Sequence, residues 1–554
     1  MYSLKILPAV LALIAMPLAA SAQQPASPNE VVDKIVAQEH AEVQLLRQYA
    51  PMVETYIQYL RADNEVGSVP HGDKYFLGRA DMSKGLELET LGVNHRLFAG
   101  LKEFFSMEFV PLGFLQMIYV DRDGLDRNHY RFEYARREFL GEVRCLVFDV
   151  VPLPKSGRGR FVGRIWVEDQ NYQIVRFNGA YGGPSLVSYY FNFDSWRVNV
   201  GKNLWVPAFI YSEEGGVNDK QTRNIGYKPF RAQTRIWGYN LGHPARREEE
   251  LNKVVVEAPT EITDQSEAAN DYSPIQAQRS WDRQAEDNIA ERLEQQGLMA
   301  PSGEVDKVLG TVVNNLEVTN SLDIQPEIRC RVLMTSTLES FTIGHTIVLS
   351  RGLIDVLPDE ASLAAILAHE MGHVILGHRL DSQFGFFSTL LVGEKETFRY
   401  FDFARTPEEE RAANQRASEL LKNSPYKTSE GTAQLFLQAL KNRSKQIPNL
   451  ISPNLGDKVP TNWTLASAEF SAKPNEKSPA SVIAALPLGG RIKIDPWDDQ
   501  LRMLKSKPVG TIAESEKMPF QITHFLFYLT RQGDNSLPEA SGPVATKLPN
   551  DTKP

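Results

Sequence analysis

The residues with the clearest chemical potential lie at 369–373, where the chain reads His-Glu-Met-Gly-His. This stretch fits the pattern H-E-x-x-H, and the surrounding residues predict a helix. Positions i and i+4 of a helix are about 40° apart around its axis, so both imidazoles leave the same face. Two imidazoles on one face can bind a single Zn²⁺, and the glutamate between them can handle the proton of a water molecule. The pattern therefore indicates metal-assisted hydrolysis of peptide bonds.

The residues around this motif favour a buried metal site over a solvated surface helix. The run Ala361–His378 is apolar on almost every face, which is typical of a buried helix. Asp359 is placed to cap its N-terminus. Buried histidines need partners, because unpaired buried polar groups cost several kcal/mol. A zinc ion would supply the partner; the alternative is a surface helix that carries two solvated histidines.

A catalytic zinc normally has three protein ligands and a water molecule, so a third ligand is expected elsewhere. Thr406-Pro407-Glu408-Glu409 reads as a capping box with proline at the first helical position, which predicts a helix that begins there. Glu408 then lies on the helix face that is exposed to solvent, and the Glu409 side chain is used in the capping box. Glu410 shares its stripe with small or apolar residues. We therefore expect Glu410 to be the third ligand; the alternative is a glutamate favoured only by the helix dipole.

His378 is a further candidate zinc ligand, because it lies only five residues after His373. On one continuous helix, however, it would lie about 140° around the axis from His373. We therefore expect His378 to stay out of the zinc shell, and to support a ligand, pack against neighbours or face solvent.

Three segments together resemble the zinc metallopeptidases of the HtpX and CAAX-prenyl-protease type, a gluzincin family that also has mitochondrial members. The first joins Arg331-Val-Leu-Met334 to the run from Ser340 to Ile354, similar to the family's strand and "G-x-I-x-V-x-x-G-L" pattern. The second, Leu363 to His378, is similar to "L-A-x-V-L-A-H-E-x-G-H". The third, Glu410 to Asn414, is similar to "E-x-x-A-D", whose glutamate is the third zinc ligand. The resemblance agrees with the choice of Glu410 from helix phase.

The resemblance implies roles for the metal ligands, the catalytic base and the substrate-binding strand. One Zn²⁺ per chain would be held by three ligands: His369, His373 and Glu410. Glu370 would be the catalytic base that takes a proton from water and delivers it to the leaving amine. A polypeptide substrate would lie as an extended strand, bound through main-chain hydrogen bonds, beside an edge strand that contains Ser340, Phe341 and Thr342.

The sequence departs from the family pattern in three places. Asn414 stands where the family has an aspartate that orients a zinc-binding histidine; an amide still forms hydrogen bonds but carries no charge. Ser340 replaces the asparagine of the edge strand. No clear "T-H-P…R" segment follows the third ligand, which leaves the group that stabilises the tetrahedral intermediate unassigned.

Length, charge and cysteine content narrow the class of protein. The chain has 554 residues, enough for two to four domains. With 42% hydrophobic and 23% charged residues, it has the composition of a globular protein. The net charge of −9 is the opposite of the basic surface that nucleic-acid-binding proteins present, so it does not favour that class of protein. Two cysteines, Cys145 and Cys330, make no disulfide framework. We expect two buried free thiols; the alternative is a disulfide between two domains of an exported protein.

The N-terminus has the features of a secretory signal. Lys5 precedes an apolar run from Ile6 to Ala20, and Ala20-Ser21-Ala22 fits a cleavage site. The alternative is an uncleaved membrane anchor, for which the run is short. We expect export to a bacterial periplasm, with the mature protein soluble or loosely associated with the membrane periphery.

Composition shifts divide the remainder into segments. The expected fold class is α+β: a mainly helical zincin-type domain with a small sheet, preceded by an antiparallel β-rich domain that can curve into a half-barrel. Helices are expected at 279–297 and 303–316. The predicted boundaries are a signal peptide at 1–22, an N-terminal helix at 28–62, the β-rich domain at 63–245, a linker at 246–277, the metallopeptidase domain at 278–445, a C-terminal extension at 446–530 and a disordered tail at 531–554.

Two functions are consistent with these patterns. The first is a zinc metalloendopeptidase of the cell envelope that acts on misfolded or unassembled proteins. The second is a catalytically weak or inactive zinc-binding protein of the envelope with a chaperone-like or carrier-like role, because binding zinc does not require turnover. The oligomeric state does not follow from the sequence.

Overall fold

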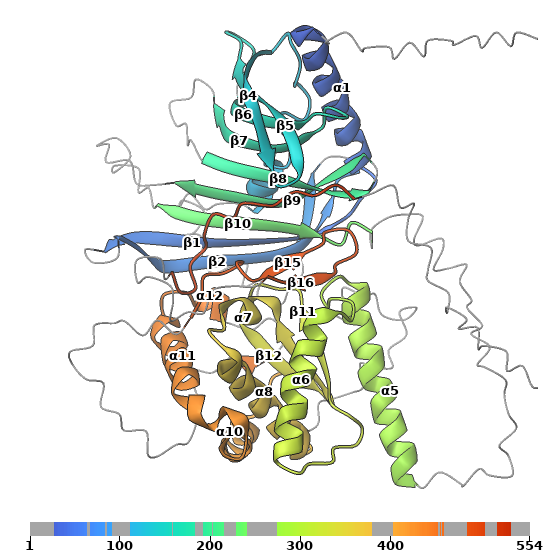
Figure 1. Ribbon diagram of the computed structural model, residues 1–554, viewed down its shortest axis with the longest axis vertical. Coiled ribbons are helices and arrows are strands. Elements are labelled where there is room, and N and C mark those ends of the chain that lie inside the picture. The colour runs from blue at the N-terminus through green and yellow to red at the C-terminus, as the bar shows by residue number, and fades with distance from the viewer. Residues whose placement is uncertain are drawn as a thin grey trace, which may run out of the picture.

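The structure, a computed structural model, contains a large β-sheet unit stacked on a helical unit (Figure 1). The predicted signal peptide, most of the linker and nearly all of the tail lie outside the described residues. Within the described part of the chain, no helix combines the length and apolarity needed to cross a membrane. The structure describes residues 27–63, 67–83, 86–90, 111–157, 159–182, 192–201, 203–214, 229–240, 274–378, 403–451, 455, 457–458, 485–504 and 518–532.

The N-terminal helix is shorter than predicted. α1 (Pro28–Leu46) begins with a capping box between Ser27 and Glu30. The chain then continues as a strand, β1 (Met52–Asp63), so the prediction of helix through residue 62 is wrong. The helical spacing of apolar residues ends at Leu46, and the β-branched and aromatic residues after it are typical of a strand with both faces buried. The sheet unit therefore starts at 52 rather than 63.

The large sheet has ten strands in the order β3-β2-β1-β10-β9-β8-β7-β6-β5-β4. Every pairing in it is antiparallel, which confirms the predicted β-rich domain. The first strand, β1, lies between β2 and the last strand, β10. The other strands are β2 (Gly67–Asp81), β3 (Glu87–Thr90), β4 (Tyr130–Leu140), β5 (Val143–Pro152), β6 (Arg160–Glu168), β7 (Ile174–Gly182), β8 (Asn192–Gly201), β9 (Leu204–Glu214) and β10 (Phe230–Trp237).

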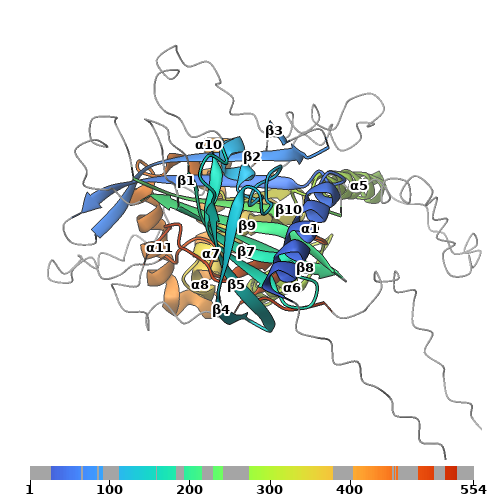
Figure 2. The same ribbon diagram turned by 90° about the horizontal axis from the view of Figure 1, so that it is seen from above.

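The two faces of this sheet belong to two hydrophobic cores. On one face, α1 lies across the strands (Figure 2), and α1 and α2 (Pro111–Gln116) bury Val53 and Ile57. On the other face, Met52 and Tyr56 join a core that continues into the helical unit. This alternation along β1 follows from the period of two in strands. Cys145 and Cys330 are buried free thiols, as expected.

A buried charged cluster holds α1 on the sheet. Arg197 of β8 donates to both carboxylate oxygens of Glu39 at 2.7 Å. Glu42, one turn later, is also buried, and its Oε1 has no hydrogen-bond partner among the described residues. Burial raises the pKa of Glu42 to about 8, against the attraction of Arg197. Glu42 is therefore protonated at neutral pH, and Arg197 and Glu39 form a matched pair.

We expect Glu42 to make the protein less stable as pH rises. Between about pH 4.5 and 8, the folded protein binds one more proton at Glu42 than the unfolded chain does. The free energy of unfolding therefore falls through this window, by at most about 1.4 kcal/mol per pH unit from this group. Denaturant unfolding at several pH values should show a flatter profile for Glu42→Gln than for the wild type. The exposed change Glu133→Gln is the control; equal profiles for Glu42→Gln and the wild type would contradict the prediction.

The helical unit contains a four-stranded sheet in the order β11-β13-β12-β14, as expected for a helical domain with a small sheet. β11 is parallel to β13, and the other pairings are antiparallel. Its elements are α5 (Pro274–Gln295), α6 (Glu304–Thr319), β11 (Arg329–Leu333), β12 (Glu339–Ile343), β13 (Thr346–Ser350), α7 (Arg351–Val356), α8 (Glu360–Ile375), α10 (Pro407–Lys422), η3 (Pro425–Ser429), α11 (Glu430–Arg443), α12 (Pro448–Ile451) and β14 (Asp457–Lys458). Because β14 belongs to this sheet, the predicted end of the metallopeptidase domain at 445 is too early. Its predicted start at 278 is too late, because α5 begins inside the predicted linker.

The C-terminal segments return to the large sheet. A hairpin of β15 (Ile492–Ile494) and β16 (Leu501–Met503) lies beside it, and residues 518–532 run along its face without forming a strand or a helix. Gln58 of β1 donates to the Phe520 carbonyl at 2.6 Å and accepts from the Ile522 N–H at 2.9 Å. His524 pairs with Asp194 of β8 at 2.7 Å.

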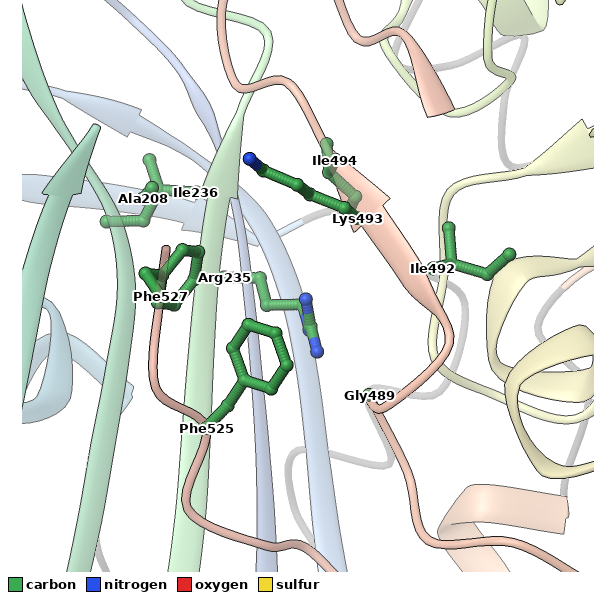
Figure 3. A pocket seen from close by; sticks show the side chains of 9 residues that line it. All are labelled: Ala208, Arg235, Ile236, Gly489, Ile492, Lys493, Ile494, Phe525 and Phe527. Carbon is green, nitrogen blue, oxygen red and sulfur yellow. The ribbon is translucent and has the colours of Figure 1, made fainter. Parts of the chain in front are cut away.

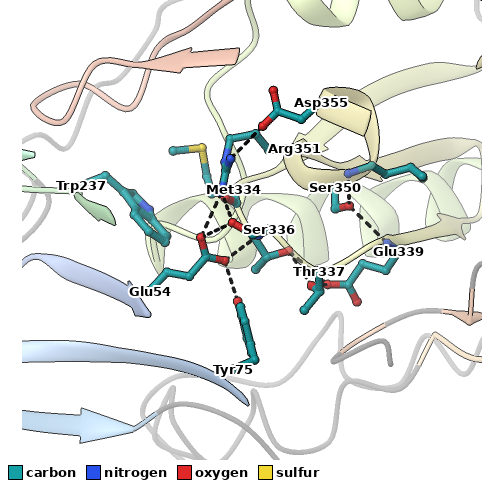
Figure 4. Close-up of polar contacts among 12 residues, drawn as sticks. Glu54, Tyr75, Trp237, Met334, Ser336, Thr337, Glu339, Ser350, Arg351 and Asp355 are labelled. Carbon is teal, nitrogen blue, oxygen red and sulfur yellow. Dashed lines mark hydrogen bonds and ion pairs between the residues drawn. The ribbon is translucent and has the colours of Figure 1, made fainter. Parts of the chain in front are cut away.

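A buried polar network joins the large sheet to the helical unit (Figure 4). Glu54 of β1 accepts hydrogen bonds at 2.5 Å from both the N–H and the hydroxyl of Ser336, in the loop before β12. Arg351 of α7 donates to Glu54 at 3.0 Å and to Asp355 at 3.1 Å. The Tyr75 hydroxyl donates to Glu54 at 2.8 Å. The sheet therefore fixes the loop that leads directly into β12.

Candidate metal centre

The two motif histidines lie near the end of α8, as the sequence predicts. Asp359 caps the helix by accepting from the Ser362 N–H at 2.9 Å. The helix packs against α6, α10 and α11 and is buried from Ala361 to His373. His369 and His373 are 1% and 0% exposed. Both imidazoles therefore leave one buried face, toward α10.

The helix that carries the third ligand begins where the capping box predicts. Thr406 and Glu409 bond reciprocally, with the Glu409 N–H donating to Thr406 at 3.3 Å and the Thr406 N–H donating to Glu409 at 3.0 Å. Glu408 is exposed and pairs with Arg411. Glu410 points inward, with 19% of its side chain exposed. The cap fixes the phase of α10 and so selects Glu410 from the three glutamates.

The three expected ligands converge. The Nε2 atoms of His369 and His373 are 3.1 Å apart, and each lies 3.4 Å from an oxygen of Glu410. Around a tetrahedral zinc with bonds of about 2.05 Å, neighbouring ligand atoms are about 3.3 Å apart. Among the described residues, these three form the single group of histidine, cysteine and acidic side chains placed to hold a metal. The donor set and its spacing therefore fit Zn²⁺.

A close contact between α8 and α10 makes this convergence possible. A Cβ atom at Gly372 would lie 2.7 Å from the Ala413 carbonyl oxygen and 3.0 Å from the Ala413 Cα. Any larger residue at 372 would push α10 away, and Glu410 with it. Gly372 occupies one of the two unspecified positions of H-E-x-x-H. The small residues at 372 and 413 are the sequence feature that could have predicted this close helix contact.

The charges of the site suit a divalent cation. Burial opposes ionisation of Glu410, but hydrogen bonds with His369 and His373 outweigh it and hold the pKa of Glu410 well below its ordinary value. Burial lowers the pKa of His373, against the attraction of Glu410. The carboxylate is therefore charged and the His373 imidazole neutral at pH 7, which are the protonation states that bind zinc.

The expected catalytic base has a specific hydrogen-bond donor. Glu370 is 1% exposed, and its Oε1 accepts from the Ser340 hydroxyl at 2.6 Å. Ser340 lies on β12, so this bond fixes the carboxylate relative to the small sheet. Ser340 was expected to bind substrate; its side chain is instead a partner of Glu370.

Both motif histidines have neutral partners at Nδ1, the ring nitrogen that faces away from Glu410. His369 Nδ1 lies 3.1 Å from the Asn414 side-chain oxygen, which places Asn414 where the family aspartate was expected to act. His373 Nδ1 lies 2.9 Å from Nδ1 of His378. α8 ends at Ile375, and Gly377 with φ +67° reverses the chain, so the His378 N–H returns to the His373 carbonyl at 3.0 Å. The continuous helix assumed for His378 is wrong, but its place outside the ligand set agrees with the expectation.

We expect Asn414→Ala to weaken zinc binding by about 10–100-fold, because His369 loses the acceptor that sets its orientation. Asn414→Asp should restore tight binding, since a carboxylate accepts the same hydrogen bond. Competition with a chromogenic chelator measures the affinity. The neighbouring exposed change Gln415→Ala is the control; unaltered affinity in Asn414→Ala would show that the amide plays no part.

The expected free edge of β12 is occupied at one end, because β14 pairs with Glu339 and Ser340. The described part of β14 does not reach Phe341 and Thr342, so their assignment to a substrate-binding edge stays a prediction. β12 lies between β13 and β14, and Ser340 is the register partner of Asp457. The Phe341 ring stacks on Phe403 at 4.6 Å. The carbonyl and hydroxyl of Thr342 accept from Arg405 at 3.3 and 2.8 Å. A strand of two residues such as β14 has no recognisable sequence pattern, and the contact of Arg405 with Thr342 has none either.

Comparisons with known proteins agree with this geometry at the level of the family. Residues 317–424 match the model of peptidase family M48. The comparison with curated proteins finds no match.

Two solved structures are similar over part of the chain. A LolA superfamily protein from Nitrosomonas europaea is 12% identical, over 37% of this chain and 91% of that one, with a TM-score of 0.21. A DUF1329 family protein from Desulfovibrio piger is 12% identical, over 38% of this chain and 90% of that one, with a TM-score of 0.19.

The match to the family model covers the segment that carries all three expected ligands. By its sequence, this segment is similar to the metallopeptidases of family M48.

Proposed function

We propose that this protein is a zinc-dependent metalloendopeptidase of the HtpX and CAAX-prenyl-protease type that hydrolyses peptide bonds in polypeptide substrates. The observation that carries the proposal is the convergence of His369, His373 and Glu410 beside a buried Glu370. The match of residues 317–424 to peptidase family M48 supports it independently.

The residues divide the chemistry between them. His369, His373 and Glu410 would hold one Zn²⁺, which lowers the pKa of water to about 7 and polarises the scissile carbonyl. Glu370 takes a proton from the attacking water and returns it to the leaving amine nitrogen. Ser340 holds the Glu370 carboxylate in place. Asn414 and His378 orient the two imidazoles.

The setting of this activity is also part of the proposal. The signal-like N-terminus supports export to the periplasm of a bacterial cell, with the mature protein soluble or loosely membrane-associated. Misfolded or unassembled envelope proteins are the expected substrates, because a peptidase in that compartment would meet them as extended chains.

Removal of the metal tests the proposed activity. Purified protein should contain one zinc per chain and hydrolyse casein, and a zinc chelator should abolish hydrolysis. Stoichiometric zinc should then restore it, because the three ligands are held in place by α8 and α10. Metal analysis by mass spectrometry and a fluorescent casein assay provide the two readouts. Wild-type protein that carries no zinc, or that cuts casein equally well after chelation, would contradict the proposal.

A further inference from the structure

A small cavity lies where the large sheet meets the β15–β16 hairpin and the segment at 518–532. Its volume is about 20 Å³, enough for one particle of the size of a water molecule. Figure 3 shows Arg235 entering it from β10 and Lys493 entering it from β15. The cavity is lined by Ala208, Arg235, Ile236, Gly489, Ile492, Lys493, Ile494, Phe525 and Phe527.

Arg235 is a buried cation whose charge is not matched locally. The residue is 8% exposed, and its Nε has no hydrogen-bond partner among the described residues. Its guanidinium lies 5.2 Å from the centroid of the Phe209 ring, whose face attracts a cation weakly but carries no net negative charge. Burial, reinforced by repulsion from Arg351, lowers the pKa of Arg235 to about 10. The guanidinium is still charged at pH 7, and a buried charge without a counter-charge is costly.

The nearest carboxylates are already committed to other cations. Glu54 and Asp355 both attract Arg235, but both form their ion pairs with Arg351. Among the described residues, no ion pair joins Arg235 to either carboxylate. Among the described residues that line the cavity, two are cationic, Arg235 and Lys493, and none is acidic.

The backbone leaves room in front of the guanidinium. Gly489 has φ +82°, and a Cβ atom there would lie 2.2 Å from the Nη2 of Arg235. A side chain at 489 would thus fill the space into which the guanidinium projects. A glycine with this conformation keeps the cavity open beside the charge.

We propose that this cavity is a binding site for a small monovalent anion of the size of chloride, held by Arg235 and Lys493. The volume admits one monatomic ion and is too small for a polyatomic anion such as gluconate. A water molecule could accept a hydrogen bond from Arg235 but would bring no negative charge to it. The bound anion would link β10, the β15 hairpin and the segment that carries Phe525 and Phe527.

Thermal unfolding in two sodium salts tests this site. At matched ionic strength, the wild-type Tm should rise saturably by about 2–4 °C in chloride relative to gluconate, because gluconate is too large to enter. Arg235→Met keeps the apolar stem against Phe209 and should remove this difference. Arg231→Met is the matched control: Arg231 lies on the same face of β10 but pairs with Glu213 at 3.6 Å, so the chloride effect should remain.

A second measurement uses the unaltered protein. Wild-type crystals soaked in bromide should show an anomalous peak within hydrogen-bond distance of the Arg235 guanidinium. Equal Tm values in the two salts, a chloride effect that survives in Arg235→Met, or the absence of bromide from the cavity would each overturn the proposal. None of these results depends on peptidase activity.

Discussion

Glu370→Gln is expected to lower the rate of casein hydrolysis by about 10²–10⁴-fold while one zinc per chain remains bound. The amide keeps the size of the side chain and can still accept from Ser340, but it cannot take a proton from water. The three ligands do not include residue 370, so metal content should be unchanged. Single-turnover rates and metal analysis on the same preparation measure both quantities.

The matched control for this variant is Glu408→Gln, which makes the same change at an exposed position of α10. It should retain both zinc and activity. Equal residual hydrolysis by wild type and Glu370→Gln would exclude Glu370 as the base. It would then favour the alternative of a zinc-binding envelope protein with a chaperone-like or carrier-like role.

Arg351→Ala is expected to reduce the free energy of unfolding by about 3–5 kcal/mol, because it leaves Glu54 and Asp355 buried without their counter-charge. Both carboxylates are at most 1% exposed, and Arg351 also donates to the Met334 carbonyl at 3.0 Å. Denaturant unfolding followed by fluorescence measures the loss. The tryptophans of the large sheet report on that unit, and protease sensitivity reports on the helical unit.

An exposed ion pair provides the control for this prediction. Arg411 and Glu408 are 70% and 73% exposed, so Arg411→Ala should change stability by no more than about 0.5 kcal/mol. Arg351→Ala should also loosen the loop at Ser336 that leads to Ser340 and Glu370. A variant as stable as Arg411→Ala would show that the network does not join the two units.

The local parts of the metal site could be predicted from sequence because short-range geometry determines them. The H-E-x-x-H spacing places two imidazoles on one helix face, and the Thr406–Glu409 cap fixes the phase that selects Glu410. Gly377 was a readable signal for the end of α8, and it explains why His378 returns to His373. Its effect was missed because the apolar run appeared to continue.

The remaining features depend on contacts between distant segments, which one sequence does not reveal. β14 pairs with β12 across more than a hundred residues, so Ser340 looked like part of a free edge. The sequence of β1 was predicted as part of the N-terminal helix. It forms a strand because β2 and β10 pair with it on either side. The bonds of Glu54 to Ser336 and Arg351 likewise join segments 282 and 297 residues apart.

The contacts of Gln58 set an order of events for biosynthesis. Gln58 lies on the first strand of the chain, yet its buried amide is bonded to backbone groups 462 and 464 residues later. These two bonds cannot form until the ribosome has made the chain as far as Ile522. Before that, the Gln58 amide has only the Tyr56 hydroxyl beside it as a side-chain partner, at 3.3 Å. All ten strands of the large sheet are synthesised by Trp237, so the segment at 518–532 is added to this face of the sheet at a late stage.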